Sequence, residues 1–452
     1  MAWKHVGTIG GVAGLAWLAV IWLWPIAPIA ITTDDAFYYF GIARHLSSDH
    51  ALTFDGAEPT SGFHPLWLFA ITPFGRLMGS APDAAVRLIL SLQVLLVGAS
   101  LRLLGPRRAL VFSLCGLVFG FGKIFINGLE SALELLLLSW AISLAESPRG
   151  SRLGTIAFAG SLLTLSRLSA FAGAAVLLVV AARREEVSLR RFSFLGAILV
   201  APVVAYTAFL WTRFGHPFPI SGAIKYGSPF ALAAIVGLGL TASVLDRPSW
   251  PVWAVPLSSW IGVQLVSDVV LRHRVVPEIW YLVPHAVLFV LVALRALESR
   301  PRARAIAGAG VTIAAIASWL LRFRESSYST YAEAKAVGLW LSQNTPRDGA
   351  VAGWDCGIAA YYSGRRFSNL DGLASSWEYK VAYRDRGRVR EYLDARNIDY
   401  VAQYVPVTST GRFHGVDLSD WQVVYDRPFE FRGLLDSDTT RYRYVVLERA
   451  RR

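Results

Sequence analysis

Long apolar segments recur along most of this chain, and they limit the folds that it can adopt. A helix that crosses a membrane needs about 20 apolar residues for a hydrocarbon core about 30 Å thick, and shorter helices are tolerated inside a bundle. The ranges that qualify are 8–31, 84–104, 109–125, 131–145, 153–166, 169–182, 192–211, 229–245, 250–270, 279–297 and 306–321. Hydrophobic side chains make up 54% of the 452 residues and charged ones only 17%, which excludes an ordinary soluble protein. The sequence therefore predicts a mainly α-helical, polytopic membrane protein of about eleven transmembrane helices.

Basic residues form short clusters between the apolar segments instead of one continuous face. The net charge of +12 therefore indicates orientation in a membrane and not a nucleic-acid partner. The basic residues at positions 4, 102–108, 149–152, 183–191, 247 and 295–304 all fall on one side of the bilayer if the amino terminus is cytoplasmic and 8–31 is a retained signal anchor. That agreement requires 153–182 to be two short spans that turn near Arg167, and it predicts that 64–79 is a helix on the outer interface. An odd number of spans then places the carboxy terminus on the outer side.

The apolar segments stop near Glu325. We expect a transmembrane domain over 1–324, with its first outer loop at 32–83, and a small extracytoplasmic α/β domain over 325–452. In this tail, helix signals cover 328–342 and 388–396, and strand signals cover 350–354, 399–404, 421–425 and 441–447. Cys115 lies in an apolar segment and Cys356 in the tail, so no internal disulfide is predicted.

Several segments on the predicted outer side carry unusual motifs. They read DDAFYYFGIARH, FDGAEPTSGFHPLW, GLESAL, FGHPFPISGAIK and, in the tail, AVAGWDCGIAAYYSGRRFSNLDGL. In order and spacing the chain resembles bacterial integral-membrane glycosyltransferases of the GT-C superfamily, relatives of protein O-mannosyltransferases, the aminoarabinose transferases of lipid A and actinobacterial arabinofuranosyltransferases. The resemblance implies a large first outer loop with an acidic motif, a polyprenyl-phosphate-linked sugar as donor, and chemistry at the outer membrane surface. One departure is visible at LSRLSA, which lacks the acidic residue that the family pattern places after Arg167.

Asp34 and Asp35 are adjacent carboxylates at the end of the first apolar segment, where they are costly beside hydrocarbon. Sugar transfer from a lipid phosphate requires a base that takes the acceptor hydroxyl proton. One Asp supplies that base and the other caps the following helix, and the resemblance favours Asp34 as the base. Glu130 is a second outer carboxylate. It either orients the acceptor, holds a divalent cation (Mg, Mn or Ca) with the Asp pair, or is a helix N-terminal acid favoured by the dipole.

Cations are needed to stabilise the departing phosphate. Lys225 follows a segment rich in Gly, Pro and Ser, and such irregular backbone beside a membrane is tolerated where it lines a polar cavity. Lys225, Arg213 and His216 are therefore predicted to bind the donor phosphate, and the alternative is headgroup contact by snorkelling side chains. Arg167, at the hairpin tip, is a further phosphate candidate. Arg274 belongs to a second cationic cluster that is either a phosphate clamp or an ion-pair patch.

The remaining candidates concern the sugar and the acceptor. His64 either binds a phosphate or sugar hydroxyl or is a satisfied structural histidine, and Tyr281 is a sugar or acceptor candidate beside the second cationic cluster. The aromatic run at 37–40 favours interface packing over a sugar platform. GWDCG in the tail resembles the WWDYG motif with which oligosaccharyltransferases read acceptor peptides, without its first Trp and its Tyr. Asp355 and Asp371 are acceptor-side candidates, and the alternative is a strand that ends in a tight turn.

Together these features predict an inverting glycosyltransferase of the bacterial plasma membrane. Its partners are a polyprenyl-phosphate sugar, membrane lipids and a glycan, lipid or protein acceptor, with no nucleic acid. One alternative is an oligosaccharyltransferase that transfers a glycan en bloc to protein. Another is a transporter or lipid flippase, which should show similarly broken helices in two halves and charges at mid-membrane depth. Here the charged residues gather on one predicted face, which argues against transport.

Overall fold

The computed structural model describes residues 6–106, 108–109, 122–147, 152–226, 327–408, 412–431 and 440–450, with scattered positions between 251 and 291. The predicted spans at 229–245 and 306–321 lie outside the described residues, as do most positions of 109–125, 250–270 and 279–297. Arg274, Tyr281 and Cys115 also lie outside them.

The amino-terminal apolar segment folds into two helices and not one. α1 (Val6–Leu23) ends two residues before Pro25, and α2 (Ala27–Ile31) begins after a turn, with Pro28 in its first turn. Proline lacks the N–H that a helix interior needs, and it disfavours helical backbone at the residue before it. The prediction of a single helix over 8–31 is therefore wrong at this turn.

The first loop is largely helical. α3 (Asp34–Asp49) begins at the acidic pair. α4 (Pro65–Ile71) and α5 (Gly75–Ser80) are separated by a 3-10 turn that contains Pro73, so the predicted helix over 64–79 is two short helices. Proline is favoured in the first turn of a helix, and Pro65 and Pro82 stand at the starts of α4 and of the long helix α6 (Pro82–Leu104).

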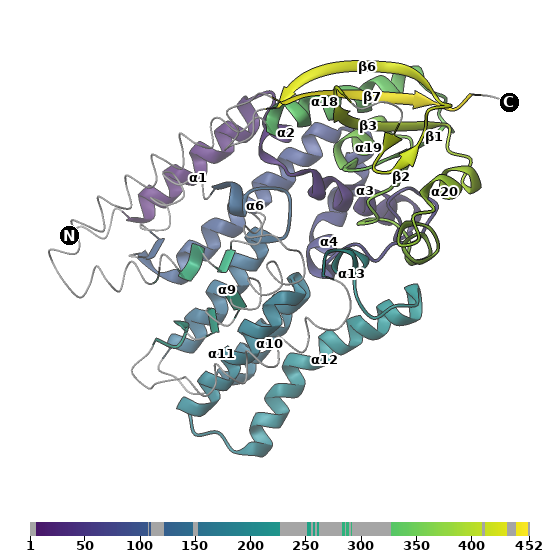
Figure 1. The fold of residues 1–452 in the computed structure, drawn as a ribbon. Coiled ribbons are helices and arrows are strands. Elements are labelled where there is room, and N and C mark those ends of the chain that lie inside the picture. The colour runs from purple at the N-terminus through teal and green to yellow at the C-terminus, as the bar shows by residue number, and fades with distance from the viewer. Residues whose placement is uncertain are drawn as a thin grey trace.

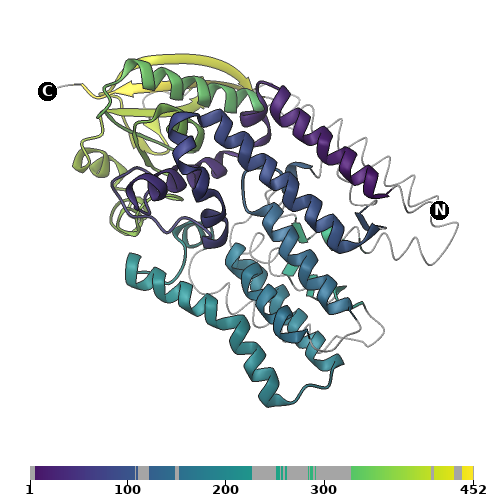
Figure 2. The ribbon, with the colours of Figure 1, turned by 180° about the vertical axis from the view of Figure 1, so that it is seen from behind.

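The next helices form a bundle with α6, seen from opposite sides in Figures 1 and 2. They are α8 (Gly122–Phe125), α9 (Ser131–Glu146), α10 (Leu153–Ser166), α11 (Phe171–Arg184), α12 (Leu189–Phe214) and the short α13 (Ile220–Tyr226). The predicted turn near Arg167 is confirmed, because α10 ends at Ser166 and α11 begins at Phe171 after a 3-10 turn. α10 packs against α9, α11 and α12.

Two of the described helices, α6 and α12, are long and apolar enough to cross a membrane. These two helices alone do not establish the number of spans that the sequence predicts. α12 exposes large apolar side chains along its length, such as Leu189 (80% exposed) and Trp211 (61% exposed). Extended apolar surface of this kind marks a contact with membrane or protein.

The tail forms an α/β layer at one end of the bundle (Figure 1). After α18 (Ser327–Asn344) comes a mixed five-stranded sheet of order β2-β1-β3-β7-β6. Its strands are β1 (Ala350–Gly353), β2 (Arg366–Asn369), β3 (Tyr400–Pro406), β6 (Gln422–Phe431) and β7 (Thr440–Glu448). β1 runs parallel to β2 and β3, and β7 runs antiparallel to β3 and β6. The four predicted strands correspond to β1, β3, β6 and β7, and the predicted helices to α18 and α20 (Val389–Ala395).

The remaining elements of the tail are short and carry no sequence period long enough to recognise. They are α19 (Gly357–Ser363), β2, a π-helical turn at Tyr379–Arg384 and the two-residue strands β4 (Arg412–Phe413) and β5 (Val416–Asp417). Alternate residues of β3 face opposite sides of the sheet. Ala402 packs in the core shared with α18, α19 and α3, whereas Val401 packs in a second core with Leu393 of α20.

Helix α3 lies between the tail and the bundle (Figures 1 and 2). Phe37 and Phe40 of α3 are fully buried, and their rings meet the ring of Tyr361 in α19 with centroids 5.2 and 5.9 Å apart. Edge-to-face contacts of this kind add to the energy of apolar burial. The first loop and the tail therefore share one apolar core.

Candidate active site

The acidic pair opens α3, but neither carboxylate caps that helix. The N-cap residue is Thr33, and no side chain makes a capping hydrogen bond there. Asp34 instead reaches the tail. Its Oδ1 accepts the backbone N–H of Ile358 at 2.8 Å, and its Oδ2 accepts that of Gly357 at 3.1 Å. Asp34 therefore caps the first turn of α19, and the interpretation of one Asp as a cap of its own helix is wrong.

Gly357 is required at this contact. A Cβ atom on Gly357 would overlap the backbone oxygen of Asp34, so no larger residue allows the same approach. The GWDCG motif that contains Gly357 thus docks its backbone against the first-loop acid. The sequence suggested both motifs separately, and the structure brings them together.

The environment of Asp34 raises its pKa to about 8. Burial of the carboxyl group is the largest cause, because it penalises the charged form. The neighbouring charges of Asp355 and Asp35 act in the same direction, and the N–H groups of Ile358 and Gly357 act against it. A carboxylate with a pKa near neutrality is a stronger base than an ordinary Asp, as general-base chemistry requires.

Tyr38, one turn after Asp34, connects three tail residues. Its hydroxyl donates to Oδ2 of Asp371 at 3.1 Å and accepts from the backbone N–H of Cys356 at 3.2 Å and from Nδ2 of Asn369 at 3.0 Å. The sequence indicated only packing for the aromatic run at 37–40, so this role of Tyr38 was missed. Its spacing of four residues from Asp34 on one helix face was the available signal.

We call the contact of Asp34 and Tyr38 with the tail the seam. The two acceptor-side candidates of the tail, Asp355 and Asp371, lie at this seam. Asp371 Oδ2 also accepts the backbone N–H of Asp355 at 3.0 Å, and Oδ1 accepts that of Leu373 at 3.0 Å. Burial raises the pKa of Asp371, and the charge of Asp355 adds to the effect. Asp355 is exposed, has a positive φ of 43°, and accepts a hydrogen bond from the hydroxyl of Tyr404 at 2.9 Å.

Lys225 of α13 forms an ion pair with Asp35, with Nζ and Oδ2 3.0 Å apart. The Lys225 side chain is only 15% exposed and that of Asp35 25% exposed. The predicted phosphate ligand therefore has a carboxylate partner in this structure. Because Asp34 and Asp35 are consecutive, the ion pair holds the Lys225 cation one residue away from the candidate base.

A second charged cluster lies buried beneath the first loop. Arg167 places Nη2 2.5 Å and Nε 3.0 Å from Oε1 of Glu130, and Nε is 3.8 Å from a carboxylate oxygen of Glu134. The side chains of Arg167 and Glu130 are 6% and 2% exposed. Burial alone would raise the pKa of Glu130, but Arg167 and then His64 outweigh it and the pKa is lowered. The structure thus gives Arg167 carboxylate partners instead of leaving it open to a phosphate.

His64 borders this cluster, with Nε2 4.0 Å from Oε1 of Glu130. Burial lowers the pKa of His64 to about 4, and the charges of Arg167 and Lys225 act in the same direction. The ring is therefore neutral at physiological pH. A neutral imidazole can donate one hydrogen bond to a sugar oxygen but supplies no positive charge to a phosphate.

The two remaining phosphate candidates differ in their surroundings. Arg213, near the end of α12, is exposed and forms no ion pair with the residues that the structure describes. His216 stacks on Trp377 of the tail, with ring centroids 3.6 Å apart and an interplanar angle of 20°. Its Nδ1 accepts the backbone N–H of Phe218 at 3.2 Å. The structure therefore brings His216, and not Arg213, to the seam between α13 and the tail.

Two further acids tie the first loop to the tail, and sequence reasoning missed both. Glu58 is buried and accepts hydrogen bonds from Ser376 at 2.5 Å and Tyr392 at 3.0 Å, and it pairs with Arg396. Asp83 forms an ion pair with Lys335 of α18 at 2.8 Å. Glu58 stood inside the motif FDGAEPTSGFHPLW, which the sequence had already marked as unusual, and that was the available signal.

The described residues contain no group of three His, Cys, Asp or Glu side chains placed to hold a metal ion. Asp35 faces Lys225 and Glu130 faces Arg167, so two of the three predicted metal ligands have a cationic partner, and the third, Asp34, accepts two backbone N–H groups. These residues do not fit a divalent cation as they stand, and no chemical step is derived through one.

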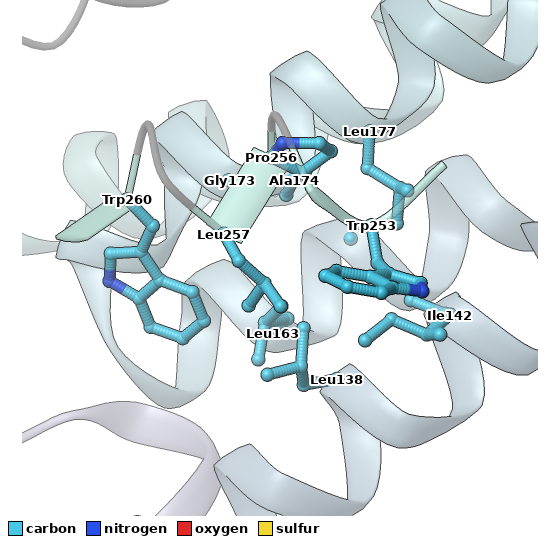
Figure 3. Close-up of a pocket in the computed structure, with 12 residues that line it drawn as sticks. Leu138, Ile142, Leu163, Gly173, Ala174, Leu177, Trp253, Pro256, Leu257 and Trp260 are labelled. Carbon is cyan, nitrogen blue, oxygen red and sulfur yellow. The ribbon is translucent and has the colours of Figure 1, made fainter. Parts of the chain in front are cut away.

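A small apolar cavity lies inside the bundle, away from the polar seam (Figure 3). Its lining comes from α9, α10, α11 and the segment around 253–260, and it includes Leu138, Leu163, Trp253 and Trp260. Leu138 and Leu163 stand one helical turn from Glu134 and Arg167, so the cavity begins where the buried charges end. A cavity with no polar lining stays dry and accepts only apolar groups.

Comparison with known proteins gives a partial family match. A family model described as a domain of unknown function (DUF8728) matches residues 317–447, which include most of the tail. No curated protein matches the chain.

Solved structures of membrane glycosyltransferases and oligosaccharyltransferases are among those similar to this chain. ArnT from Cupriavidus metallidurans in the apo state has 14% identity and a TM-score of 0.48, covering 96% of this chain and 97% of that one. The Archaeoglobus fulgidus oligosaccharyltransferase in complex with Zn and sulfate has 13% identity and a TM-score of 0.46, covering 87% and 67%. Oligosaccharyltransferase AglB from the same archaeon, with an inhibitory peptide and a dolichol-phosphate, has 12% identity and a TM-score of 0.42, covering 88% and 69%.

The likeness to ArnT and to oligosaccharyltransferases is of the kind that the sequence motifs predict.

Proposed function

We propose that this chain is an inverting glycosyltransferase that takes a sugar from a polyprenyl phosphate and transfers it to an acceptor hydroxyl at a membrane surface. One observation carries the proposal. Asp34, a carboxylate with a raised pKa, stands next in sequence to Asp35, which holds the Lys225 cation at 3.0 Å. A base and a cation are the two groups that such a transfer needs.

In the proposed reaction Asp34 accepts the proton of the acceptor hydroxyl as its oxygen attacks the anomeric carbon. The bond between that carbon and the phosphate oxygen breaks, and its electron pair leaves with the polyprenyl phosphate. Lys225 faces the negative charge that develops on the departing phosphate, and the configuration at the anomeric carbon inverts because attack and departure occur on opposite sides. A positioned general base is typically worth about 10²- to 10⁴-fold in rate.

The tail supplies the acceptor side in this proposal. Asp371 and the exposed Asp355 lie beside Asp34 through Tyr38 and the GWDCG backbone, so an acceptor bound at the seam meets all three carboxylates. We further propose that the chain is a multi-pass plasma-membrane protein and that residues 325–452 are its extracytoplasmic α/β domain, which packs on the first loop. The hexosyl or pentosyl nature of the donor stays a prediction.

An oligosaccharyltransferase is the second candidate. It is favoured by the place of GWDCG, since a motif that resembles an acceptor-reading sequence lies directly on Asp34. The two candidates share the base and the phosphate site. Mass spectrometry of the product separates the two candidates, because it shows whether a single sugar or a whole glycan was transferred.

The test is binding of polyprenyl phosphate to the purified protein, measured by native mass spectrometry in detergent. Lipid that co-purifies with the wild type identifies the natural donor carrier. Lys225→Ala should weaken binding by about 10- to 100-fold, because a charge-assisted contact is worth about 1.5 to 3 kcal/mol.

Lys335→Ala is the matched control, since it removes another lysine that is paired with an aspartate at 2.8 Å but lies on α18. Its lipid affinity should stay at the wild-type value. No binding of polyprenyl phosphate to the wild type, or equal affinity in both variants, contradicts the proposal.

A further inference from the structure

The helix that carries Lys225 is held by the tail as well as by the first loop. α13 follows a Gly- and Pro-containing segment at the end of α12, and its first residue, Ile220, donates its backbone N–H to Ser61 Oγ of the first loop at 3.1 Å. A seven-residue helix has little intrinsic stability, because nucleation costs more than its few hydrogen bonds return. Contacts from outside must therefore fix the place of Lys225.

Two of those contacts come from one stretch of the tail, residues 372–377. Before α13, the ring of His216 lies flat on Trp377, with centroids 3.6 Å apart. Within α13, Ile224 lies so close to Gly372 that a Cβ at that glycine would overlap the Ile224 side chain. Ile224 is the residue immediately before Lys225. The tail therefore contacts the chain both at His216, ahead of α13, and at Ile224, inside α13.

Trp377 is itself fixed. Ser376, the preceding residue, donates a hydrogen bond to the buried Glu58 of the first loop at 2.5 Å. Lys380 places Nζ 5.2 Å from the centre of the Trp377 ring. Burial and the charge of Lys380 lower the pKa of His216, so a neutral imidazole forms the stack.

We propose that Trp377 is a positioning residue for Lys225: the stack on His216 transmits the place of the tail to α13 and so sets the affinity for the donor phosphate. This inference rests on the proposed function, because it assigns Lys225 to that phosphate. In this proposal Trp377 contacts neither donor nor acceptor. It acts through α13, and a displaced cation loses the geometry on which a charge-assisted contact depends.

The first experiment reads the position of α13 without any lipid. Hydrogen exchange of the amides of 220–226 is compared in wild type, Trp377→Ala and Trp377→Phe. Trp377→Ala should speed exchange in this peptide, and Trp377→Phe should stay near wild type because a ring is kept for the stack. Trp340→Ala is the matched control, since Trp340 also makes a ring contact, with Tyr425 at 5.2 Å, but inside the tail and away from α13.

The second experiment reads donor affinity. Polyprenyl phosphate should bind Trp377→Ala about 2- to 10-fold more weakly than wild type, the change that corresponds to loss of one ring pair. Trp377→Phe should recover most of it, and turnover at saturating donor should change little in either variant. A purely structural role for Trp377 would instead lower the melting temperature and the amount of active protein, with the affinity of the folded fraction unchanged.

The outcomes separate the positioning role of Trp377 from the proposed function of the protein. The positioning role is overturned if the amides of 220–226 exchange equally fast in wild type and Trp377→Ala. It is also overturned if the Trp340→Ala control speeds this exchange as much as Trp377→Ala does. Faster exchange with unchanged lipid affinity also overturns it, because the place of α13 would then not set donor binding. If the wild type binds no polyprenyl phosphate, the proposed function fails and the assignment of Trp377 to donor affinity fails with it.

Discussion

The carboxylate of Asp34 accepts the backbone N–H of Ile358 at 2.8 Å, across 324 positions of sequence. This bond joins the start of α3 to the first turn of α19. It places the acidic motif of the first loop and the GWDCG motif of the tail in one site.

The first prediction concerns the pH dependence of transfer. Because the pKa of Asp34 is raised to about 8, its basic form grows as the pH rises through that value, and transfer should rise with it. Asp34→Asn removes the base but keeps an amide oxygen that can accept one N–H bond of α19. Transfer should fall by about 10²- to 10⁴-fold and lose this limb of the pH profile, measured under single-turnover conditions. An unchanged rate with the same profile would assign the base elsewhere.

The same shift predicts how Asp34 affects stability. An acid whose pKa is higher in the folded state than its usual 3.8 costs stability in its ionised form. The folded state should therefore lose stability as the pH rises from about 4 to about 8, and Asp34→Asn should weaken that dependence. Melting curves at several pH values provide the comparison, and parallel curves for the two proteins would contradict it.

The second prediction concerns the Asp35–Lys225 pair, which is mostly withdrawn from water. Asp35→Asn leaves the Lys225 cation without its carboxylate, and Lys225→Met leaves the Asp35 charge without its cation. Each single variant should lower the melting temperature, and the double variant should lower it by less than the sum, because removing both partners leaves no unpaired charge. A coupling of about 0.5 to 3 kcal/mol is expected. Strict additivity would show that the two side chains do not interact.

The third prediction contrasts a buried ion pair with an exposed one. Arg167→Met should destabilise the protein by about 3 to 5 kcal/mol, because it leaves Glu130 buried without its partner. Arg108→Ala breaks a pair with Glu146 of similar geometry at 2.6 Å, whose side chains are 27% and 30% exposed. Exposed pairs are worth about 0 to 1 kcal/mol. Equal costs in thermal unfolding would show that water reaches Arg167.

The fourth prediction concerns orientation. A cysteine at Val407 in the tail should react with a membrane-impermeant thiol reagent in intact cells, or in spheroplasts where an outer membrane intervenes. A cysteine at Glu186, in the turn between α11 and α12, should be protected. Native Cys356 is buried, so the wild type provides the blank. Labelling at Glu186 alone would invert the topology and move the site to the cytoplasm.

Local sequence was enough for elements with a long apolar run or a clear strand period. α10 was predicted at its observed bounds, and the turn at Arg167 came from the placement of basic clusters. The break at Pro25 was not predicted, because the apolar residues on both sides of this proline continue the pattern of a single helix. α19 and β2 are too short to show a period, so their existence depends on tertiary contacts.

The candidate site shows the same division. The residue types that carry chemistry, such as Asp34 and Lys225, stood out because charge is rare in this chain. Their partners did not, because nothing local indicates that Asp34 meets Gly357 or that Glu130 neutralises Arg167. Arg167 was predicted to bind phosphate because of its positive charge alone. Its carboxylate partners, Glu130 and Glu134, come close to it only in the folded bundle.

The two hydrogen bonds that the Asp34 carboxylate accepts from the tail both come from main-chain N–H groups. The N–H groups of Gly357 and Ile358 exist whatever side chain follows them, while a Cβ at 357 would close the space. These two bonds therefore constrain only two residue types, an acid at position 34 and a glycine at position 357. Related chains can differ at Ile358 and still form the same two bonds.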